Sequence, residues 1–350
     1  MPNHKKQSNK VLLVSRFAEL DFEIIKEYLK DNYPNIEIIH INNVKNPLIR
    51  FFFNQIKIMW HLRTSRGCIV DSFVLPIGFT KTKPATKVIQ VWHALGAVKK
   101  FGYTALDTNE GTTEFKAKIA RMHKGYDYVC ASGSATIKSF TKSFGVDESK
   151  VLPIGMPRVD YLLSKTSKIM ATKQLYKKYP QLNNGKNNVL YAPTYRKNGD
   201  NAILELIKEH NPETSNLVIG HHPLRQKPAN LPAGVIYADD VNFMDLLFVT
   251  DILMSDYSAA IMEAAVLDIP TIFYLFDLED YTKDRGLFFE FENSDFILPG
   301  PIINKPKDIW SFIANPKFNI DQFNKFKKMY SQPSSENCTA EIVNLLSLDD

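Results

Sequence analysis

Short apolar runs alternate along the chain with longer segments in which apolar residues recur every three or four positions. In the first part of the chain the apolar runs lie at residues 11–14, 36–41, 68–70, 87–91 and 126–130. A short run rich in β-branched residues predicts a buried strand, and an amphipathic segment between two runs predicts a crossover helix. Repetition of this unit is typical of a parallel sheet with helices on its faces.

A second alternating series follows, with apolar runs at residues 189–192, 217–220, 235–237, 252–254 and 271–274. Between the two series, residues 164–199 are strongly basic, contain no Asp or Glu, and collect turn-forming Pro, Asn and Gly at their centre. We therefore predict an α/β protein of two doubly wound domains, residues 1–180 and 181–350, whose strand ends face each other across a cleft. The last segment, residues 320–346, has a helical pattern with a polar break and could cross back onto the first domain.

The composition is compatible with two ordinary globular domains. The 350 residues are 44% hydrophobic, and 43 basic against 38 acidic residues give a net charge of +5. This mild charge permits an anionic partner, but the absence of any recognition motif argues against nucleic-acid binding. The oligomeric state cannot be read from the sequence, and a homo-oligomer is left open.

The cysteines and the hydropathy of the chain indicate its cellular compartment and the kind of membrane contact that it can make. Cys68, Cys130 and Cys338 are far apart and show no CxxC spacing, which argues against a zinc site or a disulfide framework and favours a reducing, cytoplasmic setting. The N-terminal segment is polar and basic, and no stretch approaches the roughly 20 apolar residues that span a bilayer. Any membrane contact is therefore expected to be peripheral.

Several common catalytic motifs are missing, whereas polar clusters follow many of the predicted strands. There is no GxGxxG after the first strand, and no GxxxxGK[ST], GxSxG or HExxH. The clusters are QVWHALGAVKKFG from Gln90, YAPTYR from Tyr191, GHHPL from Gly220, SDYS from Ser255 and DLEDYTKDRG from Asp277. Clusters placed so regularly at strand ends indicate a ligand site.

Each cluster also has a purely structural interpretation. Packing alone could explain His93 and His222, and Arg196 could be a surface arginine. Ser255, Asp256 and Ser258 precede a helical run, so they could bind an anion or could simply cap the helix. The acids of LFDLED, residues 275–280, could hold a metal, receive ribose hydroxyls or be solvated.

Taken together, these motifs resemble the CDP-glycerol glycerophosphotransferases of teichoic acid synthesis. The similarity rests on WHALGAVKKFG, GMPRVD (residues 155–160), YAPTYR, the His222–Pro223 pair and the long run from Ser255 to Gly286. It implies a GT-B fold and transfer of glycerol phosphate from CDP-glycerol with release of CMP. WHALG stands where the family's polymerases commonly show WHGTP, and together with the chain length this resembles the priming members, which act on an undecaprenyl-diphosphate disaccharide.

The resemblance and the chemistry together give each residue a role. His93 is the candidate base for the incoming hydroxyl, because an imidazole of ordinary pKa accepts a proton near pH 7. His222 and Arg196 are expected to hold the diphosphate and stabilise the leaving CMP. The remaining assignments are the β-phosphate for Ser258, with the helix N-terminus behind it, a substrate contact for Ser255, orientation of a histidine for Asp256, and the cytidine ribose for Glu279. No metal and no cofactor are expected, because two or more cationic groups are available.

The alternatives are CDP-ribitol or a capsule acceptor on the same fold, a polymerase, a UDP-sugar transferase, and a non-catalytic lipid-binding subunit of wall assembly. A lipid acceptor requires contact with the inner face of the membrane. Residues 46–66 are rich in Phe, Ile and Trp with interspersed Arg and Lys, so they could form an interfacial helix. Apolar residues on all sides favour a core helix instead, in which case the basic residues 165–186 would supply the attraction.

Overall fold

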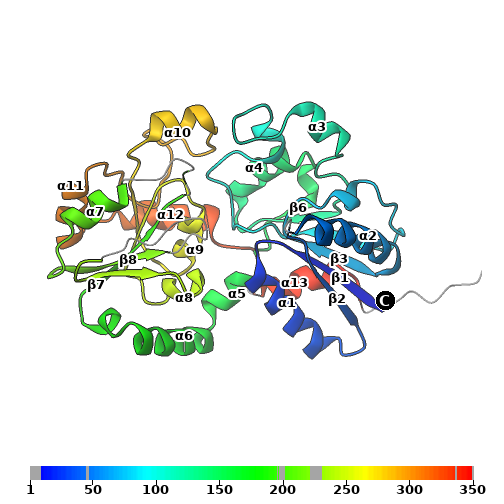
Figure 1. Ribbon diagram of the computed structural model, residues 1–350, viewed down its shortest axis with the longest axis horizontal. Coiled ribbons are helices and arrows are strands. Elements are labelled where there is room, and N and C mark those ends of the chain that lie inside the picture. Colours follow the sequence, from blue (N-terminus) through cyan, green and yellow to red (C-terminus); the bar gives the residue numbers. More distant parts are fainter. Residues whose placement is uncertain are drawn as a thin grey trace, which may run out of the picture. The chain divides into compact units, whose positions relative to one another are not determined.

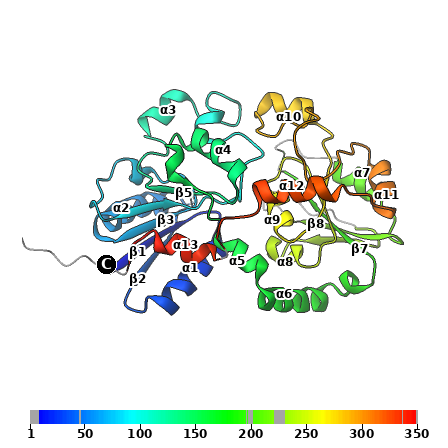
Figure 2. The same ribbon diagram turned by 180° about the vertical axis from the view of Figure 1, so that it is seen from behind.

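A computed structural model of the chain describes residues 9–44, 47–194, 196, 202–220, 231–335 and 337–348. The chain divides into two compact units, each built on a parallel sheet (Figure 1, Figure 2). Unit 1 contains the residues up to Tyr161, the short segment Asp284–Gly286 and the residues from Gln332 onward, and unit 2 contains Leu162–Lys283 and Leu287–Ser331. The α/β class with two parallel sheets, predicted from the sequence, is confirmed.

Unit 1 has a six-stranded sheet with the order β2-β1-β3-β4-β5-β6. Its strands are β1 (Lys10–Ser15), β2 (Glu37–Asn42), β3 (Gly67–Val70), β4 (Lys87–Gln90), β5 (Tyr128–Cys130) and β6 (Val151–Leu152). Its helices are α1 (Glu19–Asn32), α2 (Leu48–Thr64), α3 (Glu114–Ile119), α4 (Ser134–Phe144), α5 (Pro157–Leu163, which runs into unit 2) and α13 (Cys338–Asn344), with the short turns η1 (Leu75–Gly78), η2 (Gly102–Ala105) and η3 (Glu148–Lys150).

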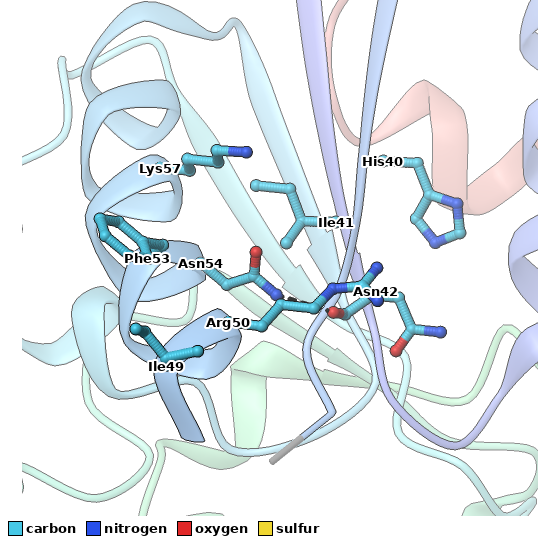
Figure 3. A pocket seen from close by; sticks show the side chains of 8 residues that line it. All are labelled: His40, Ile41, Asn42, Ile49, Arg50, Phe53, Asn54 and Lys57. Carbon is cyan, nitrogen blue, oxygen red and sulfur yellow. Dashed lines mark hydrogen bonds between the residues drawn. The ribbon is translucent and has the colours of Figure 1, made fainter. Parts of the chain in front are cut away.

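Helices cover both faces of this sheet. All four apolar residues from Val11 to Val14 are fully buried, as expected for a parallel strand that is covered on both sides. Side chains of α1 and α13 pack on one face, where Leu13, Phe22 and Ile342 share a core. On the edge strand β2, Ile41 points toward α2, whereas His40 points to the opposite side (Figure 3). Burial of each large apolar side chain contributes roughly 1.5–3 kcal/mol to stability.

Unit 2 has a five-stranded sheet with the order β11-β10-β7-β8-β9. Its strands are β7 (Asn187–Ala192), β8 (Ser215–Gly220), β9 (Val235–Ala238), β10 (Ile252–Ser255) and β11 (Thr271–Phe273). Its helices are α6 (Lys165–Lys178), α7 (Ala202–Glu209), α8 (Phe243–Leu247), α9 (Ala260–Val266), α10 (Leu278–Asp284), α11 (Pro306–Ala314) and α12 (Ile320–Tyr330), with the short turn η4 (Pro180–Asn183). Helices α7 and α11 pack together against the core that contains Leu206 and Trp310, and α9 packs with α12.

The chain passes between the two units more than once, because residues 284–286 and the residues from Gln332 onward belong to unit 1. The division falls after Tyr161, not after residue 180 as the composition suggested, because α6 packs against α8 and η4 of unit 2. The polar break within residues 320–346 separates α12, which belongs to unit 2, from α13, which packs on α1 in unit 1. Strand β6 was not predicted, since two residues carry too weak a pattern.

Helix α2 is not buried on all sides, which corrects the preference for a core helix. Its buried residues are Asn54, Ile58 and Leu62, which form one narrow stripe. Large apolar side chains on the rest of the helix are exposed, with relative exposures of 63% for Phe52 and 67% for Trp60. None of the helices in the described part of the chain combines the length and apolar character needed to span a bilayer.

Candidate active site

The carboxyl edge of the unit 1 sheet contains a buried aspartate at the point where the strand order reverses. Strand β1 lies between β2 and β3, so the crevice between β1 and β3 is the topological switch point at which open α/β sheets bind ligands. Asp71 follows β3 and is fully buried. Its Oδ2 accepts hydrogen bonds from the main-chain N–H groups of Arg16, Phe17 and Ala18 at 2.8, 2.7 and 2.8 Å. This carboxylate therefore fixes the loop between β1 and α1.

A strained turn follows β4. Trp92 has a φ of 62°, in the left-handed region that a bulky residue rarely adopts and that often marks a functional site. The Gln90 side chain holds the turn, since Oε1 accepts from the Trp92 N–H at 2.9 Å and Nε2 donates to the Ser72 carbonyl at 3.1 Å. The Trp92 indole stacks on Phe101 with 4.5 Å between ring centroids. These contacts fix the main chain immediately before His93.

The imidazole of His93 is set up to accept a proton. Its Nδ1 lies 3.0 Å from the main-chain carbonyl oxygen of Asp71. Because a carbonyl can only accept a hydrogen bond, Nδ1 carries the proton, and the neutral ring has its lone pair on Nε2. No described residue hydrogen-bonds to Nε2. Burial lowers the pKa of His93, the bond to Asp71 opposes this in part, and the positive charges of Arg158 and Arg16 lower the pKa further.

The GMPRVD motif positions this histidine and the end of the chain. Arg158 forms a buried ion pair with Asp21, in which Nε donates to Oδ2 at 3.0 Å, and its Nη1 donates to the main-chain carbonyl of His93 at 3.3 Å. Asp160 accepts the N–H groups of Cys338 and Thr339 at 2.9 and 2.8 Å, at the start of α13. The motif therefore has a positioning role that the sequence did not specify.

Arg16 is a candidate residue that the sequence analysis missed. Its half-buried guanidinium lies 4.5 Å from the centroid of the Phe17 ring, and that ring lies 4.9 Å from the His93 ring. No described residue forms an ion pair with this guanidinium or accepts a hydrogen bond from it. Burial lowers the pKa of Arg16, and the charge of Asp71 partly offsets the effect. The available signal was the position of Arg16 directly after the first strand, at an edge where anions bind.

The switch point of unit 2 lies between β7 and β10 and also contains a fully buried aspartate. Asp256 follows β10, and its Oδ1 accepts hydrogen bonds from both the N–H and the hydroxyl of Thr194 at 2.8 Å. The Tyr257 N–H donates to the same oxygen at 2.6 Å. Oδ2 lies 3.0 Å from Nη2 of Arg196. Both oxygens of this carboxylate are thus occupied by protein donors.

Arg196 is held by two carboxylates. Its Nε and Nη2 donate to the two oxygens of Asp277 at 2.7 and 3.0 Å, in addition to the contact with Asp256. Its Nη1 donates to the Thr194 carbonyl at 2.9 Å, and the guanidinium lies 4.6 Å from the centroid of the Tyr281 ring. Burial would lower the pKa of Arg196, but the hydrogen bond to Asp277 and the charge of Asp256 raise it overall. With one cation and two anions, this cluster carries a net negative charge.

The remaining predicted residues lie in different surroundings. The buried Ser255 hydroxyl donates to the Ala192 carbonyl at 2.9 Å and ties β10 to β7. Ser258 is half-buried, and its Oγ accepts the Ala260 N–H at 3.3 Å where α9 begins. Glu279 is exposed on α10 and pairs with Lys283 at 2.9 Å. His222 lies outside the described residues.

The acids of LFDLED do not converge on one point. Asp277 is occupied by Arg196, whereas Glu279 and Asp280 face solvent beside Lys283. Among the described residues, no group of three or more His, Cys, Asp or Glu side chains is arranged to hold a metal ion.

The fold and the edge residues define a Rossmann-type α/β protein with a neutral histidine, unprotonated at Nε2, at the carboxyl edge of one sheet. The chain belongs to the CDP-glycerol:poly(glycerophosphate) glycerophosphotransferase family, whose family model matches residues 2–348. The resemblance recognised in the sequence is thus confirmed, and the chain is a member of a family of transferases of teichoic acid synthesis.

Two relatives and one solved structure show the extent of the similarity. The teichoic acid ribitol-phosphate primase of Bacillus spizizenii is 33% identical over 78% of this chain and 72% of its own length. The teichoic acid glycerol-phosphate primase of Bacillus subtilis is 28% identical over 91% of this chain and 81% of its own. A structure of the wall teichoic acid polymerase TagF, a variant soaked with CDPG, superposes with a TM-score of 0.75 at 20% identity, over 97% of this chain and 88% of the polymerase chain.

Proposed function

We propose that the chain transfers glycerol phosphate from CDP-glycerol to an undecaprenyl-diphosphate-linked disaccharide, releases CMP, and so primes wall teichoic acid. Family membership and the relatives named as primases support this proposal. The observation that carries it is His93, whose Nδ1–H is bound to the Asp71 carbonyl and whose Nε2 is thereby left as a base.

In the proposed reaction, a hydroxyl oxygen of the acceptor attacks the β-phosphorus of CDP-glycerol. A new phosphodiester bond forms, and the bond from the β-phosphorus to the bridging oxygen breaks, so that CMP leaves with that oxygen. The hydroxyl proton passes to Nε2 of His93 and then to solvent. General-base catalysis of this kind contributes on the order of 10² to 10⁴ in rate.

Two arginines receive different roles in this proposal. Arg16, which has no carboxylate partner among the described residues, is available to bind an anionic phosphate oxygen beside His93. Arg196 is saturated by Asp256 and Asp277, so we assign it the positioning of the β7 and β10 ends rather than the diphosphate contact first expected. Ser258, Glu279 and His222 keep their expected roles with the donor, and His222 rests on the family motif alone.

The membrane contact is assigned to α2. The exposed Phe52, Phe53, Ile56 and Trp60 would enter the interface at the cytoplasmic face of the membrane, while Arg63 would meet anionic lipid. Co-sedimentation with phosphatidylglycerol vesicles tests this assignment. The double variant Phe52→Ser/Trp60→Ser should lose binding, and unchanged binding would rule out α2.

The test of the reaction is CMP release by the purified protein given CDP-glycerol and a short-chain disaccharide-diphosphate lipid, with the product mass recorded. One added glycerol phosphate, lost in His93→Asn, is the expected result. A ladder of products would instead indicate a polymerase. No CMP release from either CDP-glycerol or CDP-ribitol would favour a UDP-sugar transferase or a non-catalytic subunit.

CDP-ribitol is the second candidate donor. A relative that is 33% identical carries the name ribitol-phosphate primase, and none of the described edge residues distinguishes the two polyols. Competition between CDP-glycerol and CDP-ribitol in the same assay decides between them by the ratio of kcat/KM.

A further inference from the structure

A cavity of about 620 Å³ lies between α2 and the edge strand β2, in unit 1 (Figure 3). The residues that line it are Arg50, Lys57, Asn42, Asn54, Ile41, Ile49, Phe53 and His40, and the ring of His40 points away from α2, against Phe22 of α1. The lining contains no carboxylate. Its volume is within the range of small-molecule sites, and its mixture of cations and apolar groups suits an anionic amphiphile.

The cations are arranged along one stripe of α2. Arg50, Asn54 and Lys57 follow the i, i+4, i+7 spacing that places side chains on one helix face, and Figure 3 shows Arg50 and Lys57 reaching from α2 toward β2. Asn54 donates to the Asn42 carbonyl at 3.0 Å and so ties α2 to the end of β2 between the two cations. Among the described residues, neither Arg50 nor Lys57 has an ion-pair partner, so two positive charges remain for a ligand.

The cavity lies on the same edge of the sheet as the candidate base. Asn42 ends β2, and Asp71 and His93 follow β3 and β4, so all three lie at carboxyl ends of parallel strands. Strand β2 is three positions from β4, a separation of about 14 Å at the usual strand spacing. A diphosphate held in the cavity could therefore present a hydroxyl at the far end of an attached disaccharide to His93.

The exposed apolar residues of α2 lie beside this cavity. An interfacial helix lies at the boundary between headgroups and acyl chains, so its basic residues are at the level of lipid phosphates. Ile49 and Phe53 line the cavity and are also exposed, at 68% and 55%. A prenyl chain that leaves the cavity can thus contact the apolar side chains of Ile49 and Phe53.

We propose that this cavity binds the diphosphate group of the lipid-linked acceptor, with Arg50 and Lys57 as its ligands; this inference rests on the proposed function. Bound there, the acceptor keeps its chain in the membrane and its sugar directed toward His93.

Calorimetric titration of the full-length protein with farnesyl diphosphate tests the site without any turnover. Farnesyl diphosphate should bind more tightly than farnesyl monophosphate, and farnesol should not bind. Arg50→Gln and Lys57→Gln should each weaken binding about fivefold, as expected for loss of one exposed charge pair. Arg63→Gln is the matched control, because Arg63 is an exposed cation of the same helix that does not line the cavity. Equal weakening by Arg63→Gln, or equal affinity for the monophosphate, would overturn the proposal.

Kinetics separate this inference from the proposed function. In the CMP-release assay, the same two substitutions should raise the KM for the acceptor and leave the KM for CDP-glycerol unchanged. Turnover with an unchanged acceptor KM would overturn the cavity assignment alone. Binding of farnesyl diphosphate that depends on Arg50, without CMP release, would leave the cavity standing and overturn the reaction. Displacement of farnesyl diphosphate by phosphatidylglycerol vesicles at equal phosphate concentration would assign the cavity to bulk lipid and contradict the proposal.

Discussion

The switch points of the two units have the same architecture but different electrostatics. In each unit a buried aspartate follows the strand beside the unit's first strand, Asp71 after β3 and Asp256 after β10, and each accepts main-chain N–H groups from the loop after that first strand. Asp256 has both oxygens paired and neutralises Arg196 together with Asp277. Among the described residues, Asp71 Oδ1 is buried without a hydrogen-bond partner, and the nearby Arg16 forms no ion pair.

This difference indicates a division of labour within one fold. In unit 2 the charged groups at the edge bind one another, which suits a rigid support. In unit 1, Asp71 orders the loop through one carboxylate oxygen and sets the tautomer of His93 through its main-chain carbonyl. Among the described residues, neither Nε2 of His93 nor the Arg16 guanidinium has a hydrogen-bond partner. The proposed chemistry is accordingly assigned to the unit 1 edge.

The largest effect is expected from His93→Asn, which removes the base and should lower kcat by about 10² to 10⁴. CMP release at saturating substrates measures it, and thermal unfolding of the variant serves as the control for folding. Retention of more than a tenth of the activity would show that the open nitrogen is not the base.

Asp256→Ala should destabilise unit 2 by about 3 kcal/mol or more, because the N–H and hydroxyl of Thr194 and the N–H of Tyr257 lose their acceptor, at about 1–3 kcal/mol for each donor left buried and unsatisfied. Urea unfolding checks this value. Asp71→Asn in unit 1 is a milder change than Asp256→Ala, and it should cost less stability, since the amide oxygen of Asn can still accept from the loop N–H groups. A larger loss for Asp71→Asn would reverse the proposed division of labour.

Arg16→Gln should lower kcat/KM about 10- to 100-fold, the effect of losing one charge-assisted hydrogen bond to a phosphate. Arg66→Gln is the control, because Arg66 is a half-buried arginine at the opposite, amino end of the same sheet, where it donates to the Ser347 carbonyl. Equal losses in the two variants would mean that Arg16 acts only on the fold.

The smallest effect is expected in the pH dependence of kcat/KM. Burial lowers the pKa of His93, so the acidic limb should lie below pH 6.5, and activity should fall only when the pH drops through this lowered pKa. The charge of Arg16 contributes to the lowering, so Arg16→Gln should move the limb to higher pH. If the acidic limb of kcat/KM lies at the same pH in Arg16→Gln as in the unchanged protein, the charge of Arg16 does not affect the pKa of His93.

Low pH also acts on the fold, and the two effects are separable. Burial lowers the pKa of His123 to about 3, so its neutral form stabilises the native state above pH 6.5, and this stability is lost as the pH falls from 6.5 toward 3. Unfolding measured at each pH of the kinetic profile distinguishes this loss from protonation of His93.

Much of the fold was predictable, because parallel strands buried on both sides leave continuous apolar runs such as residues 11–14. The same periodicity predicted that His93 and Asp256 lie at strand ends. The partners of Arg196 were not predictable, since Asp277 is 81 residues away in the chain and pairs with it only through the order of β7, β10 and β11. For α2 the sequence left both an interfacial and a core helix open and favoured the core, because its apolar residues surround the helix and the pattern does not say which side packs.

The most direct test of the account is the protonation state of His93, read from the ring-nitrogen chemical shifts of the protein labelled with ¹⁵N-histidine. The His93 signal is assigned by its loss in His93→Gln. The account predicts a neutral ring at pH 7 with the proton on Nδ1 and an unprotonated Nε2. A proton on Nε2, or a doubly protonated ring at that pH, would contradict the claim that the unit 1 edge presents an open base.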